Sequence, residues 1–159
     1  MRGETKQAIL VHGLWMAPFA MWPLARRLRG LGFAPHRFGY PSRDHELADH
    51  AARLDGWLAE RFVPGQGLAF VGHSLGGIVL RALAARNPHW FEEARTVLLG
   101  SPNGGSAGAR FLSGYRAGRW WLGRAGRELA GDGARRLPCP PGEVGVLAGT
   151  RSRVWTERF

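Results

Sequence analysis

Cysteine is nearly absent from this 159-residue chain, which contains Cys139 and no other. A single cysteine cannot form an internal disulfide framework or a zinc site made of several thiolates. We therefore assign no metal ligands in the sequence. A reducing, cytoplasmic setting is expected.

Long hydrophobic runs are also missing. No stretch reaches the roughly 18 uninterrupted apolar residues of a transmembrane helix, and residues 1–7 are too polar for a secretory leader. Hydrophobic residues make up 45% and charged residues 21% of the chain, which is typical of a soluble globular protein. This length predicts a single domain spanning residues 1–159.

Lysine is scarce as well, because Lys6 is the only lysine among the 22 basic residues. With 12 acidic residues the net charge is +10, and residues 110–159 carry 10 basic and 4 acidic residues. Such an excess could attract phosphate backbones. However, the predominance of arginine over lysine, together with 24 glycines and 10 prolines, suggests a bias in the overall residue composition. We interpret the charge as a solvated surface and predict no specific nucleic-acid partner.

Short apolar runs alternate with stretches of helical periodicity. The expected strands lie at residues 8–11, 33–38, 68–71, 96–99 and 144–148, and helices are expected at 23–31, 47–62 and 75–86. Pro35 argues for an outer position of the second strand, and Ser42 or Asp44 is the expected cap of the second helix. This alternation predicts an α/β fold of three layers, with a mostly parallel sheet of about five strands and helices on both faces.

Residues 106–138 interrupt this alternation. They are rich in glycine and arginine, and they contain the pair Trp120 and Trp121. We expect one or two short amphipathic helices inserted between the fourth and fifth strands. The insert is either a lid over the carboxyl edge of the sheet or a surface excursion packed by its own aromatic residues.

The third strand-to-helix junction carries the clearest chemical signal. Residues 72–76 read Gly-His-Ser-Leu-Gly and lie between an apolar run and a periodic helix, which is the context of a nucleophile elbow. There Ser74 would be held above the sheet on a strained turn. Gly72 and Gly76 would allow strand and helix to pass closely. The helix amino terminus would place the Leu75 N–H beside a developing oxyanion.

Two further junctions are expected at the same edge of the sheet, because ligands of open α/β sheets bind at the carboxyl ends of the strands. The turn at His12 and Gly13 can aim the Leu14 N–H toward the serine as a second oxyanion donor. The loop after the fourth strand contains Ser101 and Pro102, which form either a structural turn or a pocket floor. Trp15 is a further pocket candidate, although ordinary core packing explains an aromatic residue equally well.

At these positions the chain resembles the α/β-hydrolase family, in particular its small bacterial esterase- and lipase-like members. The resemblance rests on residues 11–14 with 22–24, on 72–77, on 99–102 with 105–106, and on 146–150, and it extends over essentially the whole chain. It implies a nucleophilic Ser74, oxyanion N–H groups from Leu14 and Leu75, a small-molecule or lipid acyl-ester substrate, and no cofactor.

A catalytic base is harder to find. Hydrolases of this kind order their triad as serine, acid and histidine along the chain, yet His89 is the only histidine after Ser74. A helix of this length would carry His89 on the order of 20 Å away from the serine. Of the earlier histidines, only His45 is expected on the correct edge. Residues 150–159 contain Glu157 and no histidine.

These observations predict that the chain is truncated at its C-terminus, with the acid and base missing. They leave 144–148 as an apolar edge strand through which copies can associate. The leading interpretation is a serine hydrolase of acyl esters. The alternative is a catalytically inactive, hydrolase-like binding module or decayed fragment.

Overall fold

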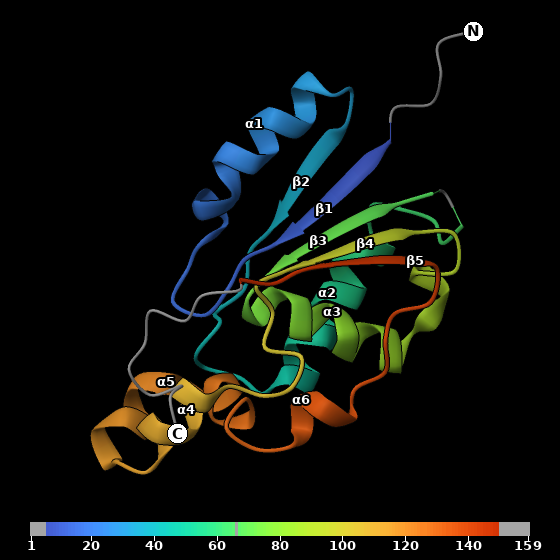
Figure 1. Cartoon of the computed structure of the whole chain (residues 1–159). Coiled ribbons are helices and arrows are strands. Elements are labelled where there is room, and N and C mark those ends of the chain that lie inside the picture. The colour runs from blue at the N-terminus through green and yellow to red at the C-terminus, as the bar shows by residue number, and fades with distance from the viewer. Residues whose placement is uncertain (1–5, 66, 150–159) are drawn as a thin grey trace, which may run out of the picture.

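The computed structural model describes residues 6–65 and 67–149 and is built around a parallel β-sheet (Figure 1). The strands are β1 (Gln7–Val11), β2 (Ala34–Phe38), β3 (Ala69–His73), β4 (Arg95–Leu99) and β5 (Glu143–Leu147). They lie in the order β2-β1-β3-β4-β5, and all four neighbouring pairs are parallel. The predicted sheet of about five strands is confirmed.

Helices cover both faces of this sheet, as predicted (Figure 1). Helix α1 (Trp22–Gly30) lies on one face, preceded by the short helix η1 (Pro18–Met21). Helices α2 (Leu47–Ala59) and α3 (Leu75–Arg86) pack side by side on the other, and η2 (Pro88–Trp90) follows α3. Most of the core lies between the sheet and α2 and α3, whereas a small cluster of Leu10, Met21, Ala25 and Val71 lies under α1.

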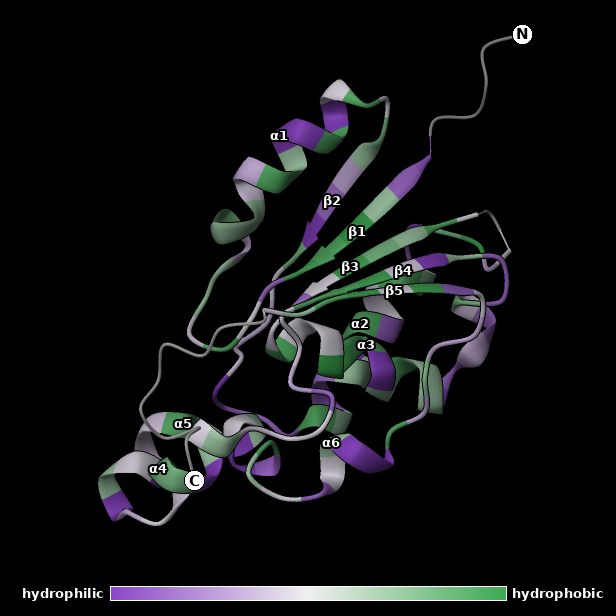
Figure 2. Ribbon diagram, in the orientation of Figure 1, coloured by the Kyte–Doolittle hydropathy of each residue, from purple (hydrophilic) through white to green (hydrophobic). Residues whose placement is uncertain are grey.

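The edge strands differ from the central ones. Strand β2 carries Pro35 and polar residues at one edge, as predicted, and Figure 2 shows it less hydrophobic than β1. Strand β5 forms the other edge, where Val146 and Leu147 are 56% and 59% exposed. Among the described residues β5 pairs only with β4. A row of unpaired backbone groups beside exposed apolar side chains is therefore open at this edge.

The predicted cap of α2 is wrong. Glu46 caps the helix through a capping box, in which its side chain accepts from the Asp49 N–H and the Asp49 carboxylate accepts from the Glu46 N–H. Ser42 instead accepts a hydrogen bond from the Trp15 N–H at 3.1 Å. Its hydroxyl is therefore used to hold the loop after β1, a contact that no local pattern could reveal.

The 106–138 insert forms three helices rather than one or two. These are α4 (Ala107–Ser113), α5 (Arg116–Glu128), which is broken at Gly123, and α6 (Gly133–Arg136). The Leu47 N–H donates to Glu128 Oε1 at 2.9 Å, and the Arg124 N–H donates to the Arg43 carbonyl at 2.8 Å. These bonds attach the insert to the first residue of α2 and to the loop that precedes it. No helix in the described ranges is long and apolar enough to cross a membrane.

The buried His50 makes stability depend on pH. Its side chain is fully buried, and burial, with smaller contributions from nearby His45 and Arg53, lowers its pKa to about 4. The unfolded chain therefore binds a proton below about pH 6.5, whereas the folded chain does so only near pH 4. We expect the free energy of unfolding to fall by about 3 kcal/mol as the pH drops through this window.

Urea denaturation between pH 7.5 and 4 tests this expectation. The variant His50→Gln should lose the part of the pH dependence that His50 contributes, because glutamine does not titrate, whereas His12, whose pKa is also lowered by burial, keeps its own contribution. The control His89→Gln, which replaces an exposed histidine, should keep the wild-type slope. Equal slopes for wild type and His50→Gln would contradict the assignment.

Candidate active site

Ser74 lies in the turn between β3 and α3, at the carboxyl edge of the sheet. Its backbone has φ 53° and ψ −121°, a conformation that costs roughly 1–3 kcal/mol for a residue with a side chain. Two hydrogen bonds anchor it: the Ser74 N–H donates to the Leu99 carbonyl at 2.9 Å, and the Gly77 N–H donates to the Ser74 carbonyl at 3.1 Å. The strand–turn–helix context expected of a nucleophile elbow is thus present.

The glycines around Ser74 allow backbone segments to touch. A Cβ on Gly72 would lie 2.5 Å from the Gly77 nitrogen in α3, and a Cβ on Gly76 would lie 2.6 Å from the His12 carbonyl oxygen. A Cβ on Gly77 would overlap the Ser101 hydroxyl. Helix α3 therefore starts in direct contact with β3, which precedes it, with the end of β1 and with the loop after β4.

The turn after β1 lies against Ser74. A Cβ on Gly13 would lie 3.1 Å from the Ser74 Cβ, which shows how closely the two turns approach. The buried His12 supports the turn: its Nδ1 lies 2.9 Å from the Gly13 carbonyl oxygen and must therefore carry the proton that it donates. Burial lowers the pKa of His12, so the ring stays neutral at pH 7.

Tyr40 completes this support from the neighbouring strand segment. Its hydroxyl donates to the His12 carbonyl at 2.7 Å, and its ring stacks on the imidazole at 4.4 Å. Burial raises the pKa of the Tyr40 phenol, which therefore remains a donor throughout the physiological range. His12 is thus a structural part of the turn.

The two predicted oxyanion donors have free N–H groups. Neither the Leu14 N–H nor the Leu75 N–H donates to another group in the described part of the chain. Trp15, next to Leu14, has a positive φ of 66° and is held by its bond to Ser42. Two unengaged N–H groups on turns that flank one serine are the arrangement that can stabilise a developing oxyanion.

The remaining predicted pocket residues occupy different places. Ser101 lies beneath the elbow, where its hydroxyl is 3.5 Å from the Gly72 carbonyl oxygen. Pro102 is half-buried in the same loop, and its carbonyl accepts from the Gly105 N–H at 2.9 Å. Trp15 is 39% exposed and stacks on Trp121 of α5 at 4.3 Å. Trp15 and the insert therefore meet beside Leu14.

Two arginines that sequence reasoning missed hold the loops of this edge. Arg81 is buried in α3 and donates to the carbonyls of Pro138, Asn103 and Leu137. Arg43 donates to the Trp120 carbonyl at 2.8 Å, and its guanidinium lies 4.1 Å from the Trp15 ring centre. Only Arg81 had a local signal, since it is the one charge in the interior of an otherwise apolar helix that ends at Arg86.

No histidine is hydrogen-bonded to Ser74 among the described residues, which include all six histidines. The candidate His45 contacts Asp49 at 3.9 Å and Arg53 at 3.2 Å, on the surface of α2. His89 lies in η2, beyond the far end of α3, beside Glu92. Glu157 lies outside the described residues. The described ranges also contain no cluster of side chains suited to a metal ion.

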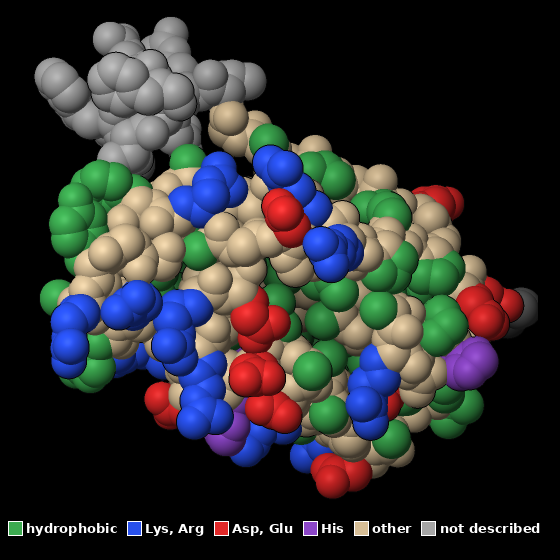
Figure 3. Space-filling model, turned by 90° about the horizontal axis from the view of Figure 1, so that it is seen from below, with side chains coloured by type: hydrophobic (Ala, Val, Ile, Leu, Met, Phe, Trp, Pro, Cys, Tyr) green, Lys and Arg blue, Asp and Glu red, His purple; other side chains and the backbone are tan. Residues whose placement is uncertain are grey.

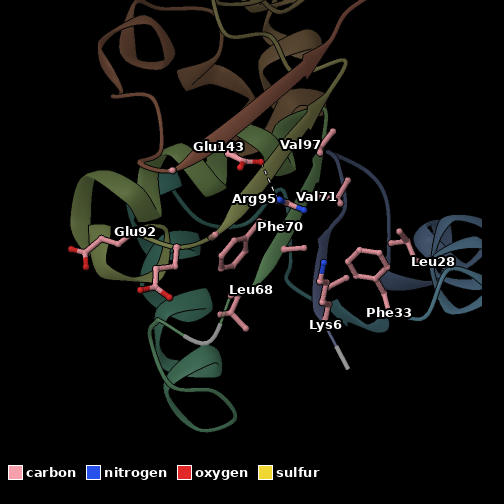
Figure 4. A pocket seen from close by; sticks show the side chains of 16 residues that line it. Lys6, Leu28, Phe33, Leu68, Phe70, Val71, Glu92, Arg95, Val97 and Glu143 are labelled. Carbon is pink, nitrogen blue, oxygen red and sulfur yellow. Dashed lines mark ion pairs between the residues drawn. The ribbon is translucent and has the colours of Figure 1, made fainter. Parts of the chain in front are cut away.

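A cavity of about 560 Å³ lies away from this edge, at the amino ends of the strands (Figure 4). It is lined by apolar residues such as Leu28, Phe33 and Phe70, with the Arg95–Glu143 ion pair at 2.9 Å on its wall. It lies between α1 and the part of the same sheet face that α1 does not cover. Because Ser74 lies at the opposite edge, this cavity is separate from the residues around Ser74.

Comparison with known proteins agrees with this architecture. The model of the family described as the alpha/beta hydrolase family matches residues 8–159. No curated protein sequence matches the chain significantly.

Solved hydrolases share the fold at low sequence identity. The mature lipase BlEst2 of Bacillus licheniformis is 20% identical, with a TM-score of 0.63 over 84% of this chain and 58% of that one. An extracellular alpha/beta-hydrolase from a Paenibacillus species is 18% identical, with a TM-score of 0.55 over 66% and 46%. A Paleococcus ferrophilus monoacylglycerol lipase is 21% identical, with a TM-score of 0.54 over 67% and 45%. The chain thus spans about half the length of these structures.

The backbone contact at Gly76 generates a stability prediction. In Gly76→Ala the new methyl group would press against the Val11 and His12 carbonyls, which belong to the end of β1 and cannot move independently. We expect the free energy of unfolding to fall by about 2–3 kcal/mol in urea denaturation.

Gly56→Ala is the matched control for this substitution. Gly56 is an exposed position within α2 with no atom near the added methyl group. Alanine should therefore stabilise the protein there, by about 0.5–1 kcal/mol. Stabilisation by both variants would contradict the close approach at the elbow.

Proposed function

The chain belongs to the alpha/beta hydrolase family, and from this premise we propose that the protein is a serine hydrolase of carboxylic acyl esters. Ser74 is the nucleophile, and the Leu14 and Leu75 N–H groups form the oxyanion hole. The proposal is carried by one observation: a serine at φ 53° in a strand-to-helix turn, against which the Gly13 turn is packed.

The chemistry follows from this arrangement. The Ser74 oxygen attacks the ester carbonyl carbon while its proton passes to a base, and the carbonyl oxygen gains negative charge. The free N–H groups of Leu14 and Leu75 stabilise that charge, aided by the positive end of the α3 dipole. Collapse of the tetrahedral intermediate breaks the bond to the alcohol oxygen, and the alcohol leaves with the proton that the base had taken. Water then attacks the acyl-serine and gives a proton to the base, and the acid is released as that proton returns to the serine oxygen.

The aromatic residues beside Leu14 support an apolar acyl site. Trp15 and Trp121 stack at 4.3 Å and join the turn after β1 to α5. In this proposal residues 106–138 act as a lid within a single domain spanning 1–159, and the substrate is a small-molecule or lipid ester. The solved structures named above include two lipases, which supports an acyl-ester substrate.

One observation favours a second function. No imidazole is hydrogen-bonded to Ser74 among the described residues, so the described part of the chain identifies no residue as the base that takes the serine proton. A chain with an intact elbow but an unactivated serine would be a binding module that holds ester- or acid-like ligands. The two functions differ in the reactivity of Ser74.

A fluorophosphonate probe tests that reactivity, because it labels activated serines. We expect labelling at Ser74, located by mass spectrometry of peptides, and its loss in Ser74→Ala. The matched control Ser113→Ala, on α4, should keep wild-type labelling. Hydrolysis of p-nitrophenyl butyrate should fall at least roughly 1000-fold in Ser74→Ala.

Two results would overturn the proposal. Labelling that persists in Ser74→Ala would place the nucleophile elsewhere. An unlabelled wild-type protein with an intact thermal transition would leave the binding module as the function.

A further inference from the structure

Positive charge is concentrated on the inserted helices α4 and α5. Residues 107–128 contain five arginines and one carboxylate, Glu128, which is half-buried and accepts from the Leu47 N–H. The arginines are all exposed: Arg110, Arg116, Arg119, Arg124 and Arg127. None of them forms an ion pair within residues 6–65 and 67–149. Figure 3 shows blue side chains gathered at the end of the molecule where Figure 1 places α4 and α5.

Several of these arginines line one hollow. It has a volume of about 410 Å³, and its walls include Arg43, Arg119, Arg124, Arg127 and Trp120, with Asp44 as its one carboxylate. The Arg43 guanidinium lies between the Trp15 and Trp120 rings, 4.1 and 5.1 Å from their centres. Its Nε is buried and has no hydrogen-bond partner in the described part of the chain. Arg127 Nε donates to the Gly123 carbonyl at 3.1 Å. The hollow therefore presents one buried donor without a partner, exposed guanidinium groups without ion pairs, and a net positive charge.

The shape of the hollow is set by a backbone contact. Gly123 has a φ of 68°, and a Cβ there would lie 2.8 Å from the Arg43 Cα. The Arg124 N–H donates to the Arg43 carbonyl at 2.8 Å across the same contact. Helix α5 and the loop after β2 are thus locked together, so Arg43 and the α5 arginines keep their relative positions without a ligand.

Large aromatic side chains are exposed on the same two helices and the turn between them. Trp120 is 73% exposed and lines the hollow, while Phe111, Tyr115 and Trp121 are 52%, 57% and 47% exposed. Exposed aromatic residues beside arginines are the composition of helices that lie at a lipid–water interface. There the rings enter the headgroup boundary and the guanidinium groups meet phosphates.

We propose that the hollow between the loop after β2 and α5 binds the phosphate of an anionic phospholipid, and that α4 and α5 dock the protein on a membrane surface. Guanidinium groups bind phosphate through paired N–H donors, and the arginines of the hollow have no carboxylate partner among the described residues. A nucleic acid is the less fitting polyanion, because its backbone needs a charged groove along its length, whereas the α5 arginines converge on one hollow. The docking does not depend on the reactivity of Ser74.

Vesicle flotation tests the proposal with the full chain. At about 0.1 M salt, where charges are screened over about 10 Å, we expect binding to vesicles of equal phosphatidylglycerol and phosphatidylcholine. We expect no binding to phosphatidylcholine alone. The triple variant Arg119→Gln, Arg124→Gln and Arg127→Gln should bind at least roughly tenfold more weakly.

The chain offers a matched control on the other side of the sheet. Arg26, Arg27 and Arg29 are exposed on α1, so their replacement by glutamine removes the same charge. That variant should bind within about twofold of wild type if the α5 site carries the interaction. Trp120→Ala should weaken binding without changing net charge, and Ser74→Ala should bind like wild type.

Three outcomes would overturn the proposal. Equal weakening by the α1 and α5 triple variants would show attraction by net charge only. Failure of the folded wild-type protein to bind the anionic vesicles would exclude the site. Tighter binding of a single-stranded oligonucleotide than of these vesicles at the same salt concentration would make a nucleic acid the partner.

Discussion

Backbone contact at the start of α3 is the constraint on which the rest of the site depends. Gly72, Gly76 and Gly77 let this helix touch β3, the end of β1 and the loop after β4. The same contact holds Ser74 in its left-handed turn and brings Gly13 against it. A side chain at Gly76 would separate these segments and with them the serine and the N–H groups beside it. The absence of side chains at these three glycines therefore brings the segments of the site together.

The insert between β4 and β5 is attached to this site by aromatic and backbone contacts. Trp121 stacks on Trp15, next to Leu14, and the Arg43 guanidinium contacts the rings of Trp15 and Trp120. Arg81 fixes the loops at both ends of the insert through carbonyls of Asn103 and Pro138. The proposed acyl site and the proposed membrane-docking hollow are thus connected through Arg43, which contacts Trp15 beside Leu14 and also lines the hollow.

Most of the fold follows from patterns in the sequence. The alternating apolar runs predict the five strands, the edge position of β2 follows from Pro35, and the bounds of α3 agree with its apolar period. The prediction of the α2 cap was wrong because several side chains that can accept a hydrogen bond precede that helix, and the Ser42 hydroxyl accepts from the Trp15 N–H instead. The insert contains three helices where at most two were predicted, since the hydrophobic periodicity of a glycine-rich segment is weak.

The sequence by itself determined the layers and the position of Ser74, because hydrophobic periodicity and the need for glycine are local properties of the chain. Only the tertiary structure decided what Arg43, Arg81 and His45 contact. Arg43 meets Trp120 77 positions away, and Arg81 meets Pro138 57 positions away. Such pairs follow from how the sheet brings distant loops to one edge. His45 lies in the loop after β2, where local reasoning placed it, but its side chain contacts Asp49 and Arg53 of α2.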